Sequence, residues 1–185
     1  HKRADRGWLS FTSVLSVAQR GKTPFWVTLP AFGKQDPEAE HTDPTPAQIK
    51  AMTHLALAFR AHGILYYCLQ SHGGWRGLVE PKTLKAVGGK LAAAAEMAAL
   101  IHKHAELLAS LEHRGLDIRC PNPVVGAIPL QGGADKKAYV YVVNKDVKAP
   151  ASARLLLWSE TWAWTRAEAV FSGKGLDVKA ADEEG

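Results

Sequence analysis

Four side chains that could bind a small ligand lie just after two apolar segments of the sequence. They are Phe32, Gln70, His72 and Trp75. An indole stacks on the apolar face of a pyranose, and an amide and an imidazole bind hydroxyl groups. Gly73-Gly74 beside the indole allows a sharp bend of the chain. We interpret the set as a candidate sugar subsite; in the alternative, Trp75 is a hydrophobic lid and His72 is solvated.

Carboxylates are missing from the ends of both apolar segments, although hydrolysis of a glycosidic bond normally uses a pair of them. The nearest acidic residues are in the polar loop 33–43. They are Asp36, Glu38, Glu40 and Asp43. Their spacing, next to Pro37 and Pro44, is typical of a solvated loop. The sequence therefore identifies no catalytic residue.

Several other kinds of chemistry lack their motifs. The chain has no GxGxxG, GxxxxGK[ST], GxSxG or HExxH. Gly88-Gly89-Lys90 lacks the upstream glycine of a phosphate loop and belongs to a predicted helix. His102 and His104 are two residues apart on that helix, so they point about 200° apart and cannot share a metal. We predict no cofactor and no metal.

Composition favours a folded domain. The 185 residues are 46% hydrophobic, and no apolar run is long enough to span a membrane. Much of the net charge of +5 comes from basic residues near the start that flank a short apolar segment, which favours a solvated surface over a nucleic-acid site. Cys68 and Cys120 form no CxxC pair, and Cys68 is interpreted as a buried free thiol. The chain begins with His1 and carries no signal peptide, so we expect an internal start in a longer protein; the compartment stays open.

Helices and strands alternate in residues 1–114. Trp8–Arg20 predicts a helix, and Pro24–Pro30 and Ile64–Leu69 predict strands buried on both faces, as in a parallel sheet. Thr45-Pro46-Ala47-Gln48 predicts a capped helix start, and a long helix is expected from Pro81 to Glu112. Its predicted apolar seam is Leu84, Val87, Leu91, Ala94, Ala98, Ile101, Ala105 and Leu108. Two strands make no stable sheet, so further strands are expected upstream, and the open apolar edge predicts self-association.

Residues 115–185 predict a small antiparallel β module. Its short β-type runs are Val124–Leu130, Ala138–Val143, Ala153–Trp158 and, more weakly, Trp164–Phe171. A turn is expected at Gly132–Asp135. Trp158, Trp162 and Trp164 could form a stacking platform for sugar or fill the core of a sandwich, and the core role is favoured.

Together these segments resemble the C-terminal part of glycoside-hydrolase-type (β/α)8 barrels. Residues Lys22–Gly33 look like the seventh strand, Pro44–Ala58 like the capped seventh helix, and His62–Tyr67 like the eighth strand. The helix near Pro81 then looks like the eighth, and Ala138–Asn144 resembles a phrase of the β-sandwich that follows such barrels. The resemblance implies the last βα units of a barrel with an appended, truncated sandwich, and a carbohydrate ligand.

The sequence departs from the large retaining clan at one important place. Those barrels carry a nucleophilic Glu at the end of the seventh strand, where this chain has Leu29-Pro30-Ala31-Phe32. The resemblance therefore leaves two hypotheses. The chain is part of a carbohydrate-active enzyme whose acids lie on earlier strands and is inactive by itself, or it belongs to a non-catalytic glycan-binding or scaffold protein derived from such a barrel.

Overall fold

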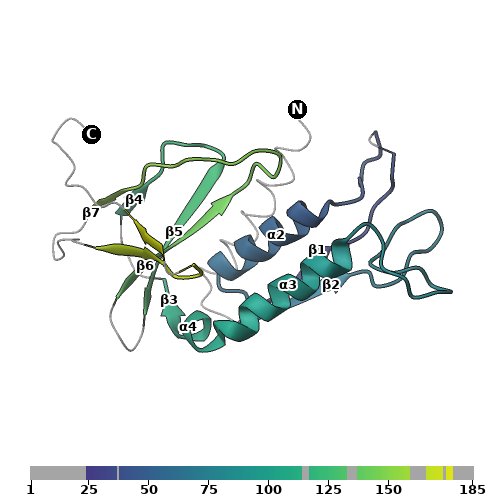
Figure 1. Ribbon diagram of the computed structural model, residues 1–185, viewed down its shortest axis with the longest axis horizontal. Coiled ribbons are helices and arrows are strands. Elements are labelled where there is room, and N and C mark those ends of the chain that lie inside the picture. The colour runs from purple at the N-terminus through teal and green to yellow at the C-terminus, as the bar shows by residue number, and fades with distance from the viewer. Residues whose placement is uncertain are drawn as a thin grey trace.

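The computed structural model describes residues 24–36, 38–113, 117–132, 137–158, 166–172 and 174–176. The predicted helix Trp8–Arg20, the tip of the predicted turn at 133–135, Trp162 and Trp164 lie outside these residues. Figure 1 shows a parallel strand pair with two helices in the middle of an elongated molecule, small antiparallel sheets at one end and long loops at the other. The mixed α/β class is confirmed. The described residues contain one parallel pair and no closed barrel.

Strands β1 (Trp26–Pro30) and β2 (Gly63–Tyr67) pair in parallel, as predicted. Their register places Thr28 beside Leu65. The expected burial on both faces is wrong, because side chains alternate between a buried face and an exposed one along each strand. Cys68 lies beyond the end of β2 and is partly exposed, not buried in a strand.

Helix α2 (Pro46–Ala58) begins at the predicted cap. The Thr45 hydroxyl accepts a hydrogen bond from the Gln48 amide, and the Gln48 side chain accepts one from the Thr45 amide, which closes the capping box. Buried Thr53 binds the Ile49 carbonyl and the Tyr66 hydroxyl, both at 2.8 Å. This contact fastens α2 to β2.

The long helix predicted for Pro81–Glu112 is shorter and interrupted. Helix α3 is Lys90–Lys103, α4 is Ala105–Ser110, and Leu111–Glu112 form strand β3. Leu84, Gly88 and Gly89 have positive φ, so residues 81–89 cannot continue a helix. The predicted apolar seam is also wrong in part: Leu91 and Ala98 are exposed. The buried residues of α3 are Lys90, Ala93, Ala94 and Met97.

The β module contains three small antiparallel sheets within the described residues. Strands β3, β5 (Val125–Gly132) and β6 (Ala138–Asn144) form one sheet, in the order β3-β5-β6. Strand β4 (Asp117–Arg119) pairs with β7 (Leu156–Trp158), and β8 (Ala167–Ala169) pairs with β9 (Lys174–Leu176). The four strands predicted for this half are present: β5 and β6 each extend past their predicted ends, whereas β7 and β8 are shorter than predicted.

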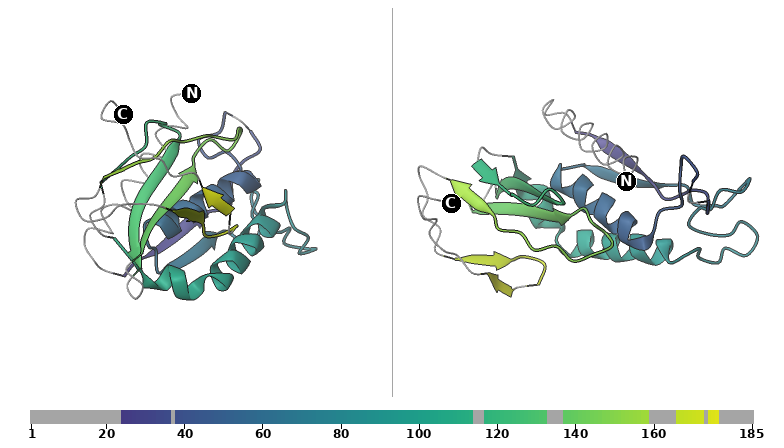
Figure 2. Two further views of the ribbon diagram at one scale, coloured as in Figure 1. Left: turned by 60° about the vertical axis from the view of Figure 1, so that its left-hand side comes forward. Right: turned by 90° about the horizontal axis from the view of Figure 1, so that it is seen from above.

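Helix α2 lies between two hydrophobic cores. Figure 2 shows α2 and α3 on one side of the β1–β2 sheet, where they enclose the first core. This core consists of Ala31, Ile49, Leu78, Val79, Ala93 and Ala94. On the other side of α2, Leu55 and Ala58 pack against the β module, with Leu111, Leu130, Tyr141 and Val143. The burial of α2 on both sides joins the two halves of the molecule.

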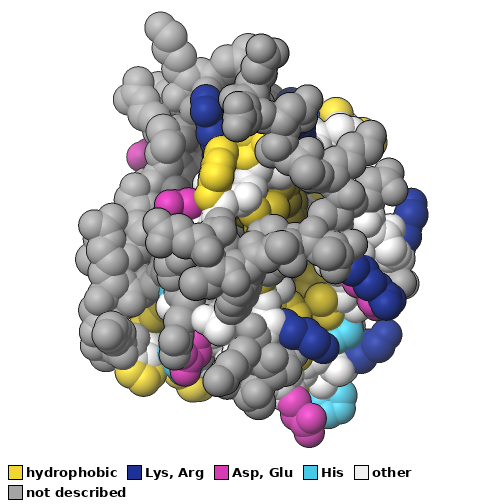
Figure 3. All heavy atoms as spheres, turned by 90° about the vertical axis from the view of Figure 1, so that its left-hand side faces the viewer, with side chains coloured by type: hydrophobic (Ala, Val, Ile, Leu, Met, Phe, Trp, Pro, Cys, Tyr) yellow, Lys and Arg dark blue, Asp and Glu magenta, His cyan; other side chains and the backbone are white. Residues whose placement is uncertain are grey.

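The surface of the described residues mixes apolar and charged groups. Figure 3 views the β-module end, where hydrophobic side chains lie among basic and acidic ones. In the part of the chain that the structure describes, no helix is long and apolar enough to cross a membrane.

Candidate functional site

The loops that follow β1 and β2 are held together by backbone hydrogen bonds. Gly33 and Arg76 exchange two of them, at 3.3 and 2.9 Å. Within the loop after β1, the Asp43 amide donates to the Lys34 carbonyl at 2.8 Å, and a Cβ on Gly33 would meet the Asp43 backbone at 2.4 Å. Both loops leave the carboxyl ends of neighbouring parallel strands, so they meet at the same edge of the sheet (Figure 1).

An aromatic cluster lies at this edge. The rings of Phe32 and Trp75 are 5.2 Å apart, and Tyr67 at the end of β2 contacts Phe32 edge to face at 5.3 Å. His41 lies 6.0 Å from Trp75, and the Lys34 ammonium lies 5.2 Å from the centre of the indole ring. We call these five residues the strand-end cluster. The sequence identified Phe32 and Trp75 but not the other three.

A tight hairpin carries Trp75 to the cluster. His72 and Trp75 exchange backbone hydrogen bonds at 2.9 and 2.8 Å across Gly73-Gly74, whose φ angles are 54° and 82°. Two consecutive residues with positive φ match a type I′ turn, which explains the Gly-Gly pair. The side chains of Gln70 and His72 are exposed on the same loop. The Trp75 side chain is partly buried and contacts Phe32 beyond the end of β1. The Gln70 and His72 side chains belong to the same loop but make no such contact with the strand-end cluster within the described residues.

A buried lysine lies behind the cluster. The side chain of Lys90, the first residue of α3, is 1% exposed. Its ammonium donates to the Ala31 carbonyl at 3.1 Å, to the Arg76 carbonyl at 2.9 Å and to the Asp43 carboxylate. Asp43 also pairs with the Arg76 guanidinium at 3.5 Å. The interpretation of Asp43 as a solvated acid is therefore wrong, because its side chain is 14% exposed and bound to two cations.

The other acidic residues of the loop do not approach the cluster as a pair. Asp36, Glu38 and Glu40 are exposed, and the Asp36 carboxylate accepts a hydrogen bond from the Glu38 amide within its own turn. The only acid held at the strand ends, within the described residues, is Asp43, and its charge is neutralised. The described residues also contain no cluster of three or more potential metal ligands. The arrangement can therefore bind a ligand by stacking, but it lacks a carboxylate pair for hydrolysis.

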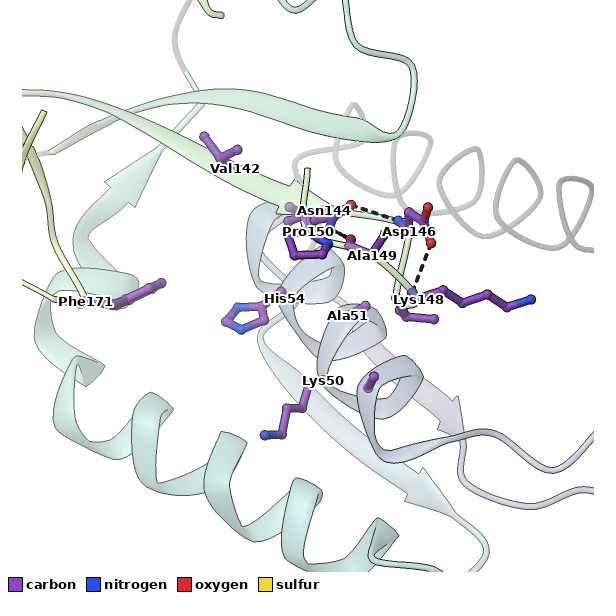
Figure 4. A pocket seen from close by; sticks show the side chains of 13 residues that line it. Lys50, Ala51, His54, Val142, Asn144, Asp146, Lys148, Ala149, Pro150 and Phe171 are labelled. Atoms are coloured by element: carbon purple, nitrogen blue, oxygen red, sulfur yellow. Dashed lines mark hydrogen bonds between the residues drawn. The ribbon is translucent and has the colours of Figure 1, made fainter. Parts of the chain in front are cut away.

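A recess lies between α2 and the turn after β6, away from the strand-end cluster. It has a volume of about 580 Å³, and Lys50, His54, Asn144, Lys148 and Phe171 are among the residues around it (Figure 4). Its polar groups are largely engaged: the Asn144 amide donates to the Ala149 carbonyl at 2.8 Å, and its oxygen accepts from the Asp146 amide at 2.9 Å. We interpret the recess as a seam between the two halves of the molecule.

His54 and Tyr141 link α2 to β6 at this seam. The His54 Nδ1 and the Tyr141 hydroxyl are 2.9 Å apart, and both rings contact Phe171. Burial and the nearby Lys50 lower the pKa of His54, against a smaller opposing effect of Glu96. Burial raises the pKa of Tyr141. Both groups are thus held in their neutral forms, which suits an interface contact.

Comparison with protein-family models, curated proteins and solved structures returned no match for this chain.

Proposed function

We propose that the chain is part of a glycoside-hydrolase-like, carbohydrate-active protein and contributes a sugar subsite at the mouth of a (β/α)8 barrel. In this proposal β1 and β2 are neighbouring barrel strands, and α2 and α3 lie on the outside of the barrel. The antiparallel sheets after Ser110 form an appended module. The ligand is an oligo- or polysaccharide that contacts Trp75 and Phe32, with Gln70 and His72 available for its hydroxyl groups.

The strand-end cluster is the observation that carries the proposal. In parallel α/β barrels, ligand sites form where the strands end at their carboxyl termini. Phe32 and Tyr67 lie at those ends, and Trp75 reaches them from the loop after β2. Aromatic rings at such a place provide the apolar surface on which a pyranose stacks. The Lys34 ammonium over the indole is on an exposed residue and can move aside for a ligand.

The open face of the β1–β2 sheet supports the barrel part of the proposal. Trp26, Leu65 and Tyr67 are 68%, 50% and 53% exposed on the face opposite α2 and α3. Within the described residues, β1 and β2 pair only with each other. Large apolar side chains on a sheet are normally covered, and in a barrel this face is the packed interior. Uncovered, the same face and edges would promote self-association.

The engaged state of Asp43 supports the alternative of a non-catalytic glycan-binding or scaffold protein. Because Lys90 and Arg76 neutralise it, no carboxylate of the described strand ends is available as acid, base or nucleophile. The enzyme therefore has to provide both carboxylates from other strands. We expect no glycosidase activity from this chain alone. Hydrolysis of aryl glycosides by the full-length protein would favour the enzyme, and binding without hydrolysis would favour the alternative.

Replacing Trp75 by Ala in the full-length protein tests the proposed subsite. Titration calorimetry against a panel of oligosaccharides is expected to show binding weakened by on the order of 1–3 kcal/mol, with little change in melting temperature. Trp158→Ala is the comparison variant: this half-exposed indole on β7 belongs to the alternative stacking platform, so weaker binding there and not at Trp75 would move the subsite to the β module. Unchanged binding together with a lower melting temperature would show that Trp75 is a hydrophobic lid.

A further inference from the structure

Lys90 is bound to the two loops at the residues next to Phe32 and Trp75. Its ammonium bonds the carbonyl of Ala31, which precedes Phe32, and the carbonyl of Arg76, which follows Trp75. The third bond, to Asp43, fixes the far end of the loop after β1. An ammonium has three donors, and here all three are used.

The stability of the fold does not by itself account for a buried ammonium at this place. Removing an ammonium from water is costly, and apolar residues of similar volume often replace buried ion pairs without loss of stability. A methionine at position 90 would fit beside Ala93 and Ala94 on α3, with the Asp43 carboxylate then paired to Arg76 alone. What an apolar side chain could not do is bind two backbone carbonyls, of Ala31 and Arg76, and the Asp43 carboxylate at one point, which the Nζ atom does.

We infer that Lys90 is a positioning residue, which sets the geometry of the Phe32–Trp75 pair and thereby the shape of the sugar subsite. This inference rests on the proposed function for the identity of the ligand but not for the geometry. The Gly33–Arg76 backbone bonds join the loop after β1 to the loop after β2. Lys90 adds the anchor from α3, so the ring pair is held against a helix as well as against the neighbouring loop. Sites work best when such a supporting shell fixes the residues that contact the ligand.

The test compares Lys90→Met with Lys85→Met in the full-length protein. Lys85 is an exposed lysine of the loop before α3, so it provides the same chemical change without the three bonds. Near-ultraviolet circular dichroism reports fixed packing of aromatic side chains. Subtracting the spectrum of the matching Trp75→Phe protein, in each background, isolates the contribution of Trp75. Far-ultraviolet spectra of all proteins show whether the secondary structure is intact.

Lys90→Met is expected to lose most of the Trp75 contribution while the far-ultraviolet spectrum is unchanged, and Lys85→Met is expected to keep it. A Trp75 contribution that survives in folded Lys90→Met would overturn the inference. If Lys90→Met does not fold, Asp43→Ala takes its place, because it removes one of the three acceptors; its Trp75 contribution should diminish, and an unchanged one would be equally contradictory.

Titration with the oligosaccharide panel then separates this inference from the proposed function. If the parent protein binds sugar, Lys90→Met is expected to bind more weakly, and unaltered affinity would overturn the link between Lys90 and the subsite. If the parent protein binds no sugar but Lys90→Met loses the Trp75 contribution, the proposed function fails while the positioning of the ring pair by Lys90 stands.

Discussion

Both faces of the β1–β2 sheet carry apolar side chains, but one face is buried and the other is exposed. On the helix-covered face Leu29 is fully buried, while on the other face Leu65 is half exposed. The Trp26 indole lies over Gly63 on that second face, where an added Cβ would come within 2.4 Å of it. One face is therefore a packed core, and the other is an apolar surface on which Trp26 and Leu65 stay half or more exposed.

The apolar residues on both faces explain why the sequence predicted that both faces of the sheet are buried. The segments Trp26–Pro30 and Gly63–Tyr67 are almost continuously apolar, which is the pattern of a strand covered on both sides. Of the helices that the structure describes, α2 and α3 cover one side of the sheet. The proposed barrel resolves the mismatch, because its interior would cover the face that carries Trp26 and Leu65.

The largest expected effect is on the covered face. Leu29→Ala should lower the free energy of unfolding of this chain by about 2–5 kcal/mol, since it leaves a cavity in a packed core. Leu65→Ala is the matched change on the open face and should cost less than about 1 kcal/mol. Urea unfolding followed by far-ultraviolet circular dichroism measures both. Equal losses would mean that the two faces are equally packed.

A smaller loss of stability is expected at the start of α2, the helix that packs on the covered face of the β1–β2 sheet. Thr45→Ala removes the hydroxyl that caps the Gln48 amide and opens the capping box. The expected loss is about 0.5–2 kcal/mol in the free energy of unfolding. Thr45→Ser keeps the hydroxyl and serves as the control. If the alanine and serine variants unfold at the same urea concentration, the cap contributes nothing.

The smallest loss of stability is expected when the pH is lowered, through His54, which contacts Tyr141 on the side of α2 away from the sheet. The pKa of His54 lies below the ordinary value of 6.5 in the folded chain, chiefly because of burial. As the pH falls below 6.5, the unfolded chain takes up more protons than the folded one, so stability decreases until the folded pKa is passed. The pKa of His113 is also lowered by burial and contributes with the same sign.

We therefore expect the urea midpoint to decrease from about pH 7.5 to about pH 5.5, with a smaller decrease in His54→Gln. The glutamine cannot titrate and retains groups that can bond to the Tyr141 hydroxyl. A pH profile identical to that of the parent chain would exclude His54 as a source of the acid sensitivity.

Local patterns in the sequence predicted the local structure well. The capping box of α2 and the bounds of β1 and β2 depend on neighbouring residues, and the structure confirms them within a few positions. A helix through 81–89 was predicted because apolar residues recur there at helical spacing. The prediction was wrong because Leu84 and the Gly88-Gly89 pair adopt positive φ, which a helix does not allow. The helix also ended early, because Leu111 pairs with Gly132 and packs against Leu130 and Tyr141, far away in sequence.

The sequence predicted two of the five residues of the strand-end cluster, Phe32 and Trp75, and none of the residues that support them. Phe32 and Trp75 were placed after strand ends by counting along the chain, and the structure brings them together. Lys90 and Asp43 were missed because a lysine at a helix start and an acid in a polar loop normally face water. Their pairing depends on contacts 47 residues apart. One signal was available: Asp43 follows the first strand and Lys90 follows the second, so both belong to the carboxyl edge of the sheet.

Thiol labelling at position 65 tests the central claim, that the open face of the sheet is an interior surface of a larger barrel. Leu65→Cys would be introduced with Cys68 and Cys120 replaced by Ser, and labelling rates would be compared between this chain alone and the full-length protein under native conditions. The proposal predicts fast labelling in the chain alone and strong protection in the full-length protein. Equally fast labelling in both would contradict it, because Leu65 would then face solvent in the complete molecule.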